Sequence, residues 1–151
     1  MLLIGYGNPG RGDDGLGPAL VERLKAMDLP GLSLDADYQL TPEMAADLAA
    51  HAQVVFADAS REPLPRPKLS PLQPRPPASF SSHGLQPAEV LYLAQRLFGA
   101  STQAFVLAIP GREFDVFREG LSAPARHQLQ LAVERVLRML SEPEPDKGRA
   151  D

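Results

Sequence analysis

An apolar run followed by a glycine-rich segment decides the fold: residues 2–17 read LLIGYGNPGRGDDGLG. Residues 2–4 are aliphatic and have the composition of a buried strand. Helical spacing of apolar residues begins at Leu16 and continues through Leu20 and Leu24 to Met27. We therefore expect a strand, a glycine-rich turn and an amphipathic helix, which is the opening unit of many α/β domains.

The same alternation recurs further along the chain. Short apolar runs predict strands at residues 32–34, 54–56 and 105–109. Helices are expected from Thr41, with Pro42 at the first helical position, from Pro87, and over residues 129–140. Because the predicted strands are apolar on both faces, the pattern favours a single-domain, three-layer α/β/α sandwich with a mostly parallel, twisted sheet over residues 1–140.

The prolines are concentrated in two segments of the chain. Many of the 16 prolines lie in residues 61–82, where missing N–H groups and fixed φ angles disfavour a helix or a central strand. This segment is expected to be a long loop. Residues 141–151 follow the last predicted helix and are expected to form a flexible C-terminal tail.

Composition excludes several kinds of chemistry. The 151 residues contain no cysteine, so thiolate metal sites, disulfides and a cysteine nucleophile are excluded. The three histidines are His51, His83 and His127. A net charge of −4 gives no general attraction to nucleic acid or to a membrane surface. With neither a signal peptide nor a membrane span in the sequence, a cytoplasmic location is expected.

The glycine-rich segment contains a literal GxGxxG pattern at residues 5–10, which is typical of dinucleotide-binding loops. In such loops the helix begins at the glycines, so that its amides meet the pyrophosphate. Here the predicted helix begins several residues later, behind Asp13 and Asp14, whose carboxylates repel a phosphate. Asp35 or Asp37 could still bind a ribose, and dinucleotide binding therefore stays an alternative. A simpler interpretation makes Asp13 or Asp14 a helix N-cap.

Three polar side chains are expected at the carboxyl ends of the strands, where parallel sheets bind ligands. Asp14 lies at the start of the first helix, Asp58 follows the third predicted strand, and His83 precedes the helix that begins near Pro87. Two carboxylates and one imidazole can bind a borderline divalent metal and leave coordination positions open. The pattern therefore predicts an O,O,N site.

Residues 7–17, with Asp58, His83 and the Ile109-Pro110 pair after the last strand, resemble the hydrogenase maturation proteases. The resemblance extends from Leu2 to about Leu140. The segment that starts at Gln39 is also similar to one branch of that family.

The resemblance implies an endopeptidase that removes a C-terminal extension from the precursor of a nickel–iron hydrogenase large subunit after nickel insertion. It implies that Asp14, Asp58 and His83 form the metal-contacting catalytic site. The metal is then nickel carried by the substrate, or else a borderline divalent ion bound by the protein itself. We expect Asn8, Asp13 and Gln39 to contact the substrate, and Asp13 or the loop amides to stabilise the oxyanion.

Two further functions stay open at this point. A non-catalytic maturation factor of the same fold would bind the precursor or its metal without cleaving it. Residues 5–10 are also similar to the opening of peptidyl-tRNA hydrolases. However, the chain then continues with Asp13-Asp14-Gly15 instead of the Thr-Arg-His-Asn run of those enzymes, and it is acidic.

Overall fold

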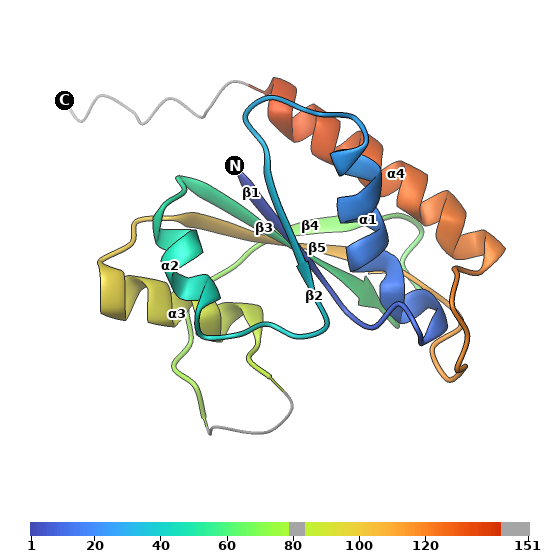
Figure 1. The fold of residues 1–151 in the computed structure, drawn as a ribbon, viewed down its shortest axis with the longest axis horizontal. Coiled ribbons are helices and arrows are strands. Elements are labelled where there is room, and N and C mark those ends of the chain that lie inside the picture. The colour runs from blue at the N-terminus through green and yellow to red at the C-terminus, as the bar shows by residue number, and fades with distance from the viewer. Residues whose placement is uncertain (79–83, 143–151) are drawn as a thin grey trace.

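A five-stranded sheet organises the computed structural model, which describes residues 1–78 and 84–142 (Figure 1). In chain order the elements are β1 (Leu2–Tyr6), the 3-10 turn η1 (Gly12–Gly15), α1 (Leu16–Lys25), β2 (Ser33–Asp37), α2 (Met44–Ala49), β3 (Gln53–Ser60), β4 (Lys68–Pro71), α3 (Pro87–Phe98), β5 (Gln103–Pro110) and α4 (Ala123–Ser141). The strand order is β2-β1-β3-β5-β4, and β4 is antiparallel to β5 while the other pairs are parallel.

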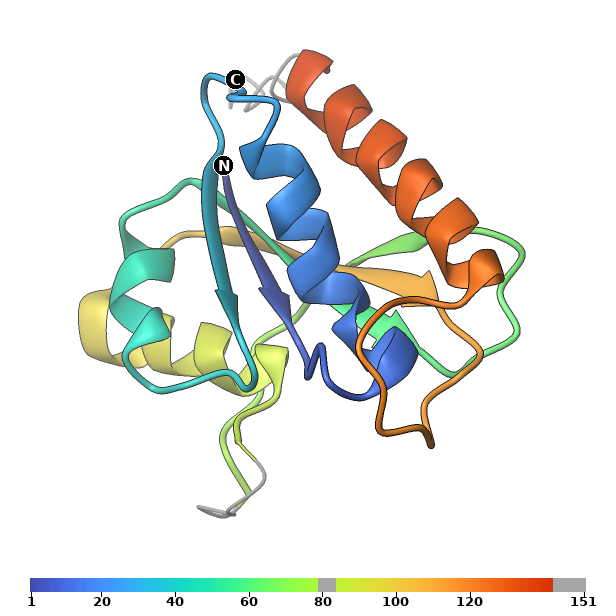
Figure 2. The same cartoon turned by 45° about the vertical axis from the view of Figure 1, so that its right-hand side comes forward.

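Helices cover both faces of this sheet. Figure 2 shows α1 and α4 on one side and α2 and α3 on the other. Because side chains alternate along a strand, Leu3 packs into the core with α1 and α4, whereas Leu2 and Ile4 pack into the core with α2 and α3. The predicted three-layer α/β/α sandwich with a mostly parallel sheet is confirmed.

The strands extend beyond their apolar runs. β3 continues through Asp58 to Ser60, because β5 runs beside it in parallel register as far as the pair Ser60 and Pro110. Asp58 therefore lies inside the strand, paired with Ala108, and not after it as the sequence suggested.

The proline-rich segment contains a strand that the sequence analysis missed. β4 occupies residues 68–71 within the expected loop and pairs with the free side of β5. An edge strand needs hydrogen-bond donors on one side only, so the prolines around it are tolerated. The prediction of an unstructured loop over residues 61–82 was therefore wrong for this part.

Two helices differ from the predictions in detail. A turn closed by the Met44 amide donating to the Thr41 carbonyl precedes α2, and the Thr41 side chain does not cap that helix. In α3 the sequence spacing predicts Val90, Ala94 and Leu97 on one apolar face; Val90 and Ala94 are buried, but Leu97 is 64% exposed. Of the expected tail, residues 143–151 lie outside the described residues. Within residues 1–78 and 84–142, no helix has the length and apolarity needed to cross a bilayer.

Candidate active site

Asp14 is held at the carboxyl end of β1 by the glycine-rich loop. It lies in η1, just before α1, and its Oδ2 accepts a hydrogen bond from the Asn8 amide at 2.7 Å. Gly7 has a φ of +136°, and a Cβ at this position would lie 2.1 Å from the Asp14 carbonyl oxygen. The loop thus requires glycine at residue 7 in order to fold back against Asp14.

Asp58 reaches the same edge of the sheet from β3. Gly5 of β1 is in register with Ala57 of β3, so the next residues along, Tyr6 and Asp58, lie side by side. Tyr6 belongs to the same face as Ile4, which is paired with Phe56. The Tyr6 hydroxyl lies close enough to the Asp58 carboxylate for the two groups to shift each other's pKa. The sequence analysis missed Tyr6. The alternation of side chains between the two faces of β1 and β3 was the signal that could have identified it.

The charges of this cluster interact with one another. Burial raises the pKa of Asp58 to about 6, and the neighbouring Asp14 carboxylate adds to this rise, while hydrogen bonds from Tyr6 and the Ala59 amide oppose it. Burial, Asp58 and Asp14 together raise the pKa of Tyr6 above its usual range. Tyr6 therefore remains a protonated donor at neutral pH, and the two carboxylates form a partly buried, negatively charged pair that suits a cation.

Asp13 has a structural role, which corrects the expectation that it contacts the substrate. Its side chain is fully buried. Its Oδ2 accepts hydrogen bonds from the amides of Arg112 and Glu113 and from the hydroxyl of Ser122, and its Oδ1 accepts one from the Ser122 amide. Burial opposes ionisation, but these hydrogen bonds lower the pKa of Asp13 below its usual value. The carboxylate therefore ties η1 to the segment between β5 and α4 and has no access to substrate.

The glycine-rich loop also lacks free amides, which argues against dinucleotide binding and against an oxyanion site in the loop. The amides of residues 7, 8 and 10–14 all donate hydrogen bonds within the protein. The Asn8 amide, for example, is already occupied by the Asp14 carboxylate. A phosphate or an oxyanion needs unoccupied donors, and this loop offers none at these positions. The GxGxxG pattern therefore allows the loop to pack against the rest of the protein.

The other predicted site residues are distributed around this edge. Asn8 is half-buried, and its side-chain oxygen accepts the Gly10 amide. Gln39 is exposed, and a Cβ on Gly84 would lie 2.8 Å from its side-chain oxygen. A bridge between Leu40 and Leu85 holds these two segments together. His83, the third predicted metal ligand, lies outside the described residues.

The remaining histidines lie away from Asp14 and Asp58. His51 follows α2, where its ring nitrogens lie 2.7 Å from the Asp47 carbonyl oxygen and 3.1 Å from the Ser33 hydroxyl. His127 is exposed on α4. Among residues 1–78 and 84–142 there is no group of three potential metal ligands. Asp14 and Asp58 nevertheless fit the oxygen-donor part of the predicted O,O,N set.

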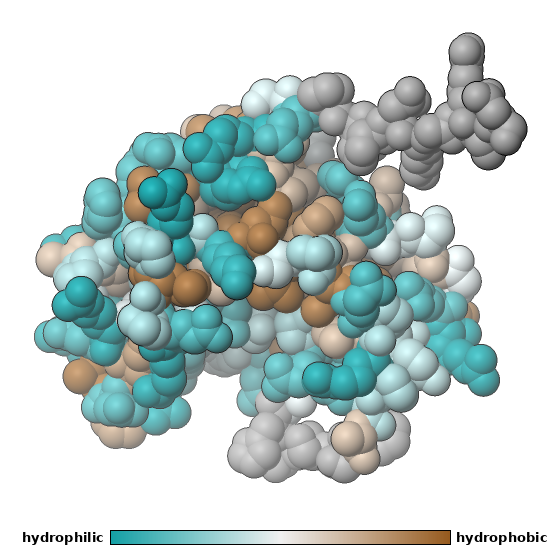
Figure 3. Space-filling view, turned by 180° about the vertical axis from the view of Figure 1, so that it is seen from behind, coloured by the Kyte–Doolittle hydropathy of each residue, from teal (hydrophilic) through white to brown (hydrophobic). Residues whose placement is uncertain are grey.

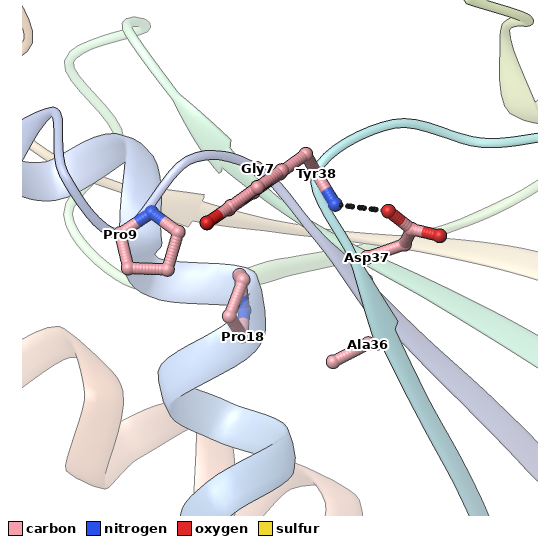
Figure 4. Close-up of a pocket in the computed structure, with 6 residues that line it drawn as sticks. All are labelled: Gly7, Pro9, Pro18, Ala36, Asp37 and Tyr38. Carbon is pink, nitrogen blue, oxygen red and sulfur yellow. Dashed lines mark hydrogen bonds between the residues drawn. The ribbon is translucent and has the colours of Figure 1, made fainter.

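A small cavity of about 280 Å³ adjoins the loop. It is formed between the start of α1 and the end of β2, and Figure 4 shows Pro18 facing Ala36 across it, with Tyr38 and Pro9 at its rim. The Gly7 amide donates to the Asp37 carbonyl at 3.1 Å, which joins the loop to β2 below this cavity. The cavity provides room beside the glycine-rich loop for part of a ligand, although neither Asp14 nor Asp58 lines it.

The same architecture occurs in solved structures of maturation proteases. HycI, a [NiFe] hydrogenase maturation protease from Thermococcus kodakarensis, is 22% identical, with a TM-score of 0.70 over 93% of this chain and 92% of that protein. A hydrogenase 2 maturation peptidase from a Thaumarchaeota archaeon is 25% identical, with a TM-score of 0.66 over 93% and 97% of the two chains. This chain has the fold of the hydrogenase maturation proteases.

The hydrogenase maturating endopeptidase HybD from E. coli has the same arrangement, with 21% identity and a TM-score of 0.71 over 92% of this chain and 90% of HybD. No protein-family profile and no curated protein sequence matches the chain. The fold expected from the resemblance is therefore confirmed, and the structural similarity covers at least 90% of this chain and of each of the three proteins.

Proposed function

We propose that this chain is an endopeptidase that removes a C-terminal extension from the nickel-loaded precursor of a nickel–iron hydrogenase large subunit. The observation that carries the proposal is the pairing of Asp14 and Asp58 at one edge of a sheet that has the maturation-protease fold. We further propose that the reaction takes place in the cytoplasm.

In this proposal Asp14, Asp58 and His83 contact the nickel that the precursor carries. The two carboxylates supply oxygen donors, and His83 supplies the nitrogen donor expected from the sequence. Three donors leave open coordination positions, so the metal can stay bound to the substrate protein while the protease contacts it. Cleavage is then conditional on metal loading, because an empty precursor offers nothing for the three side chains to bind.

Tyr6 has a positioning role in the proposed site. Its protonated hydroxyl interacts with the Asp58 carboxylate and fixes the orientation of that side chain. Loop residues 7–14 similarly fix Asp14 through the Asn8 amide. The two carboxylates are thus oriented before substrate arrives, which reduces the cost of ordering them on binding.

The test is incubation of the purified protein with a nickel-loaded large-subunit precursor, followed by mass spectrometry. We expect loss of a C-terminal peptide from the loaded precursor and no loss from the nickel-free one. The variants Asp14→Asn, Asp58→Asn and His83→Ala should each lower kcat/KM by about 100-fold or more. Asp35→Asn, which changes a carboxylate of β2 outside the site, is the matched control and should cleave normally.

Two results would contradict the proposal. If the wild-type protein binds the precursor but leaves its mass unchanged, the chain is a non-catalytic maturation factor. If cleavage proceeds equally in the His83→Ala variant, the three-residue metal contact is wrong.

A further inference from the structure

Two adjoining cavities line one side of α4. The first, of about 500 Å³, lies between the segment that follows β3 and the segment that follows β5. The second, of about 420 Å³, lies between residues 65–67 and the middle of α4. The Gln128 side-chain amide donates to the Pro65 carbonyl at 3.2 Å, where the two cavities meet. We call the pair the α4 groove.

The α4 groove is rich in arginine although the chain is acidic. Five arginines line it: Arg61 and Arg112 in the first cavity, and Arg66, Arg135 and Arg138 in the second. Only Glu62 and Glu134 are acidic residues of its lining. Against a net charge of −4 for the whole protein, this is a local concentration of positive charge.

These guanidinium groups are largely available for a ligand. Among the described residues, the one ion pair that involves them joins Arg61 to Asp115 at 3.6 Å, and both side chains are mostly exposed. Arg61 also lies over the Phe114 ring, 4.5 Å from its centroid, which holds the guanidinium at the mouth of the first cavity. Figure 3, which shows the molecule from behind relative to Figure 1, shows hydrophilic side chains interspersed with hydrophobic areas.

A second observation concerns Gln128, which lines the first cavity. Its side-chain oxygen is buried and has no hydrogen-bond partner within residues 1–78 and 84–142. The orientation of the amide is fixed, because its nitrogen donates to Pro65. A buried acceptor without a donor is uncommon in a folded protein. Through its amide nitrogen, Gln128 joins α4 to the segment that precedes β4, at the junction of the two cavities.

The groove opens at the edge of the sheet that carries Asp58. Arg61 directly follows β3, three residues after Asp58, and the Gly111 amide after β5 donates to the Ser60 carbonyl at 3.0 Å. A protease must hold its substrate on both sides of the cleaved bond. A substrate polypeptide that passes Asp58 therefore continues into the α4 groove on this side of the site.

We propose that the α4 groove binds an acidic segment of the polypeptide substrate next to the cleaved bond. This inference rests on the proposed protease function. The arginines pair with carboxylates of that segment. A polypeptide fits better than a nucleic acid, because the groove continues from the sheet edge that carries Asp58, where the proposed cleavage of a peptide bond takes place.

Binding is tested first, with a fluorescein-labelled octaglutamate peptide and fluorescence anisotropy. The wild-type protein should bind the peptide, with an affinity that falls as salt rises. The double variant Arg66→Glu/Arg135→Glu should bind at least about tenfold more weakly. The matched control Lys25→Glu/Arg96→Glu changes the net charge equally but lies on α1 and α3, and it should bind like the wild type.

Cleavage of the precursor supplies the second readout. The groove double variant should raise KM about tenfold and leave kcat unchanged, because the groove holds substrate away from Asp14 and Asp58. Equal peptide binding by the two double variants would overturn the inference, as would tighter binding of a labelled octathymidylate. If the wild-type protein binds octaglutamate through the groove but cleaves no precursor, the proposed protease function fails and the binding surface stands.

Discussion

Asp13 and Asp14 are neighbours with the same side chain, yet the fold gives them opposite environments. Asp13 is fully buried and accepts four hydrogen bonds from the segment that follows β5. Asp14 is half-buried, is close enough to Asp58 to raise the pKa of that carboxyl group, and accepts one hydrogen bond. Because successive residues of a helical turn point in different directions, one carboxylate stabilises the loop and the other remains for chemistry.

Asp13→Asn should destabilise the protein by about 2–3 kcal/mol, because the new side-chain N–H₂ group would face backbone amides that have lost their acceptor. Urea unfolding followed by circular dichroism measures the change. Asp47→Asn, at an exposed position on α2, is the control and should change stability by less than about 0.5 kcal/mol. Equal stability of the two variants would mean that the Asp13 hydrogen bonds contribute little.

Asp58 should make the stability of the metal-free protein depend on pH. Its pKa is about 6 in the folded state, above the usual value of about 3.9 in an unfolded chain. The folded state therefore binds the proton more tightly, and the free energy of unfolding falls as pH rises from about 4 to 6. Asp58→Asn should remove this decrease and stabilise the metal-free protein at pH 7 by about 1–3 kcal/mol.

Thermal unfolding of wild type and Asp58→Asn in EDTA, at pH values on both sides of 6, measures this difference. A pH dependence that is identical in the two proteins would contradict the assignment of the raised pKa to Asp58. The Asp58→Asn variant is also expected to be inactive in the precursor assay. A variant that is more stable but inactive would show that Asp58 serves function at a cost in stability.

Among the elements, α1 illustrates how glycine allows the site to form. A Cβ on Gly17 would lie 2.6 Å from the carbonyl oxygens of Tyr6 and Ala57, and one on Gly5 would lie 2.2 Å from the Gly17 carbonyl oxygen. The first turn of α1 therefore rests directly on the ends of β1 and β3. This close approach holds η1 and Asp14 beside Tyr6 and Asp58.

Gly17→Ala should destabilise the protein by more than about 2 kcal/mol and lower precursor cleavage, although alanine favours a helix over glycine by about 1 kcal/mol. The reason is the contact of the added methyl group with backbone atoms that cannot move independently. Chemical denaturation measures the loss, with Gln95→Ala on the exposed side of α3 as the control. A stabilised Gly17→Ala variant would contradict the close packing.

The sequence predicted the strands and helices wherever the local pattern of apolar residues matched the burial of those residues in the structure. The three inner parallel strands, β1, β3 and β5, follow their apolar runs, because apolar neighbours cover them on both faces. β2 lies at the edge of the sheet and is largely exposed. The sequence analysis missed β4, whose prolines are compatible with a strand only because one side of β4 is unpaired. It also missed Tyr6, whose role depends on register with β3.

At the scale of the whole molecule, charge is distributed unevenly around the edge of the sheet that carries Asp14 and Asp58. Asp14 and Asp58 make the centre of this edge negative, while the arginines of the α4 groove make the neighbouring surface positive. The net charge of −4 conceals this division, because residues 61, 66, 112, 135 and 138 come from three separate segments of the chain. A charge count along the sequence therefore excluded a generally basic protein but did not detect a basic groove.

The sequence by itself determined the layers and which segments form the parallel strands, because hydrophobic periodicity is a local property. It also determined the sheet edge at which Asp14 and Asp58 meet, because both lie at the carboxyl ends of strands. Only the tertiary structure decided that Asp13 is a buried anchor, that the loop amides are occupied and that five arginines gather in one groove. Each of these depends on partners from distant parts of the chain. Their positions follow from packing, which no local pattern encodes.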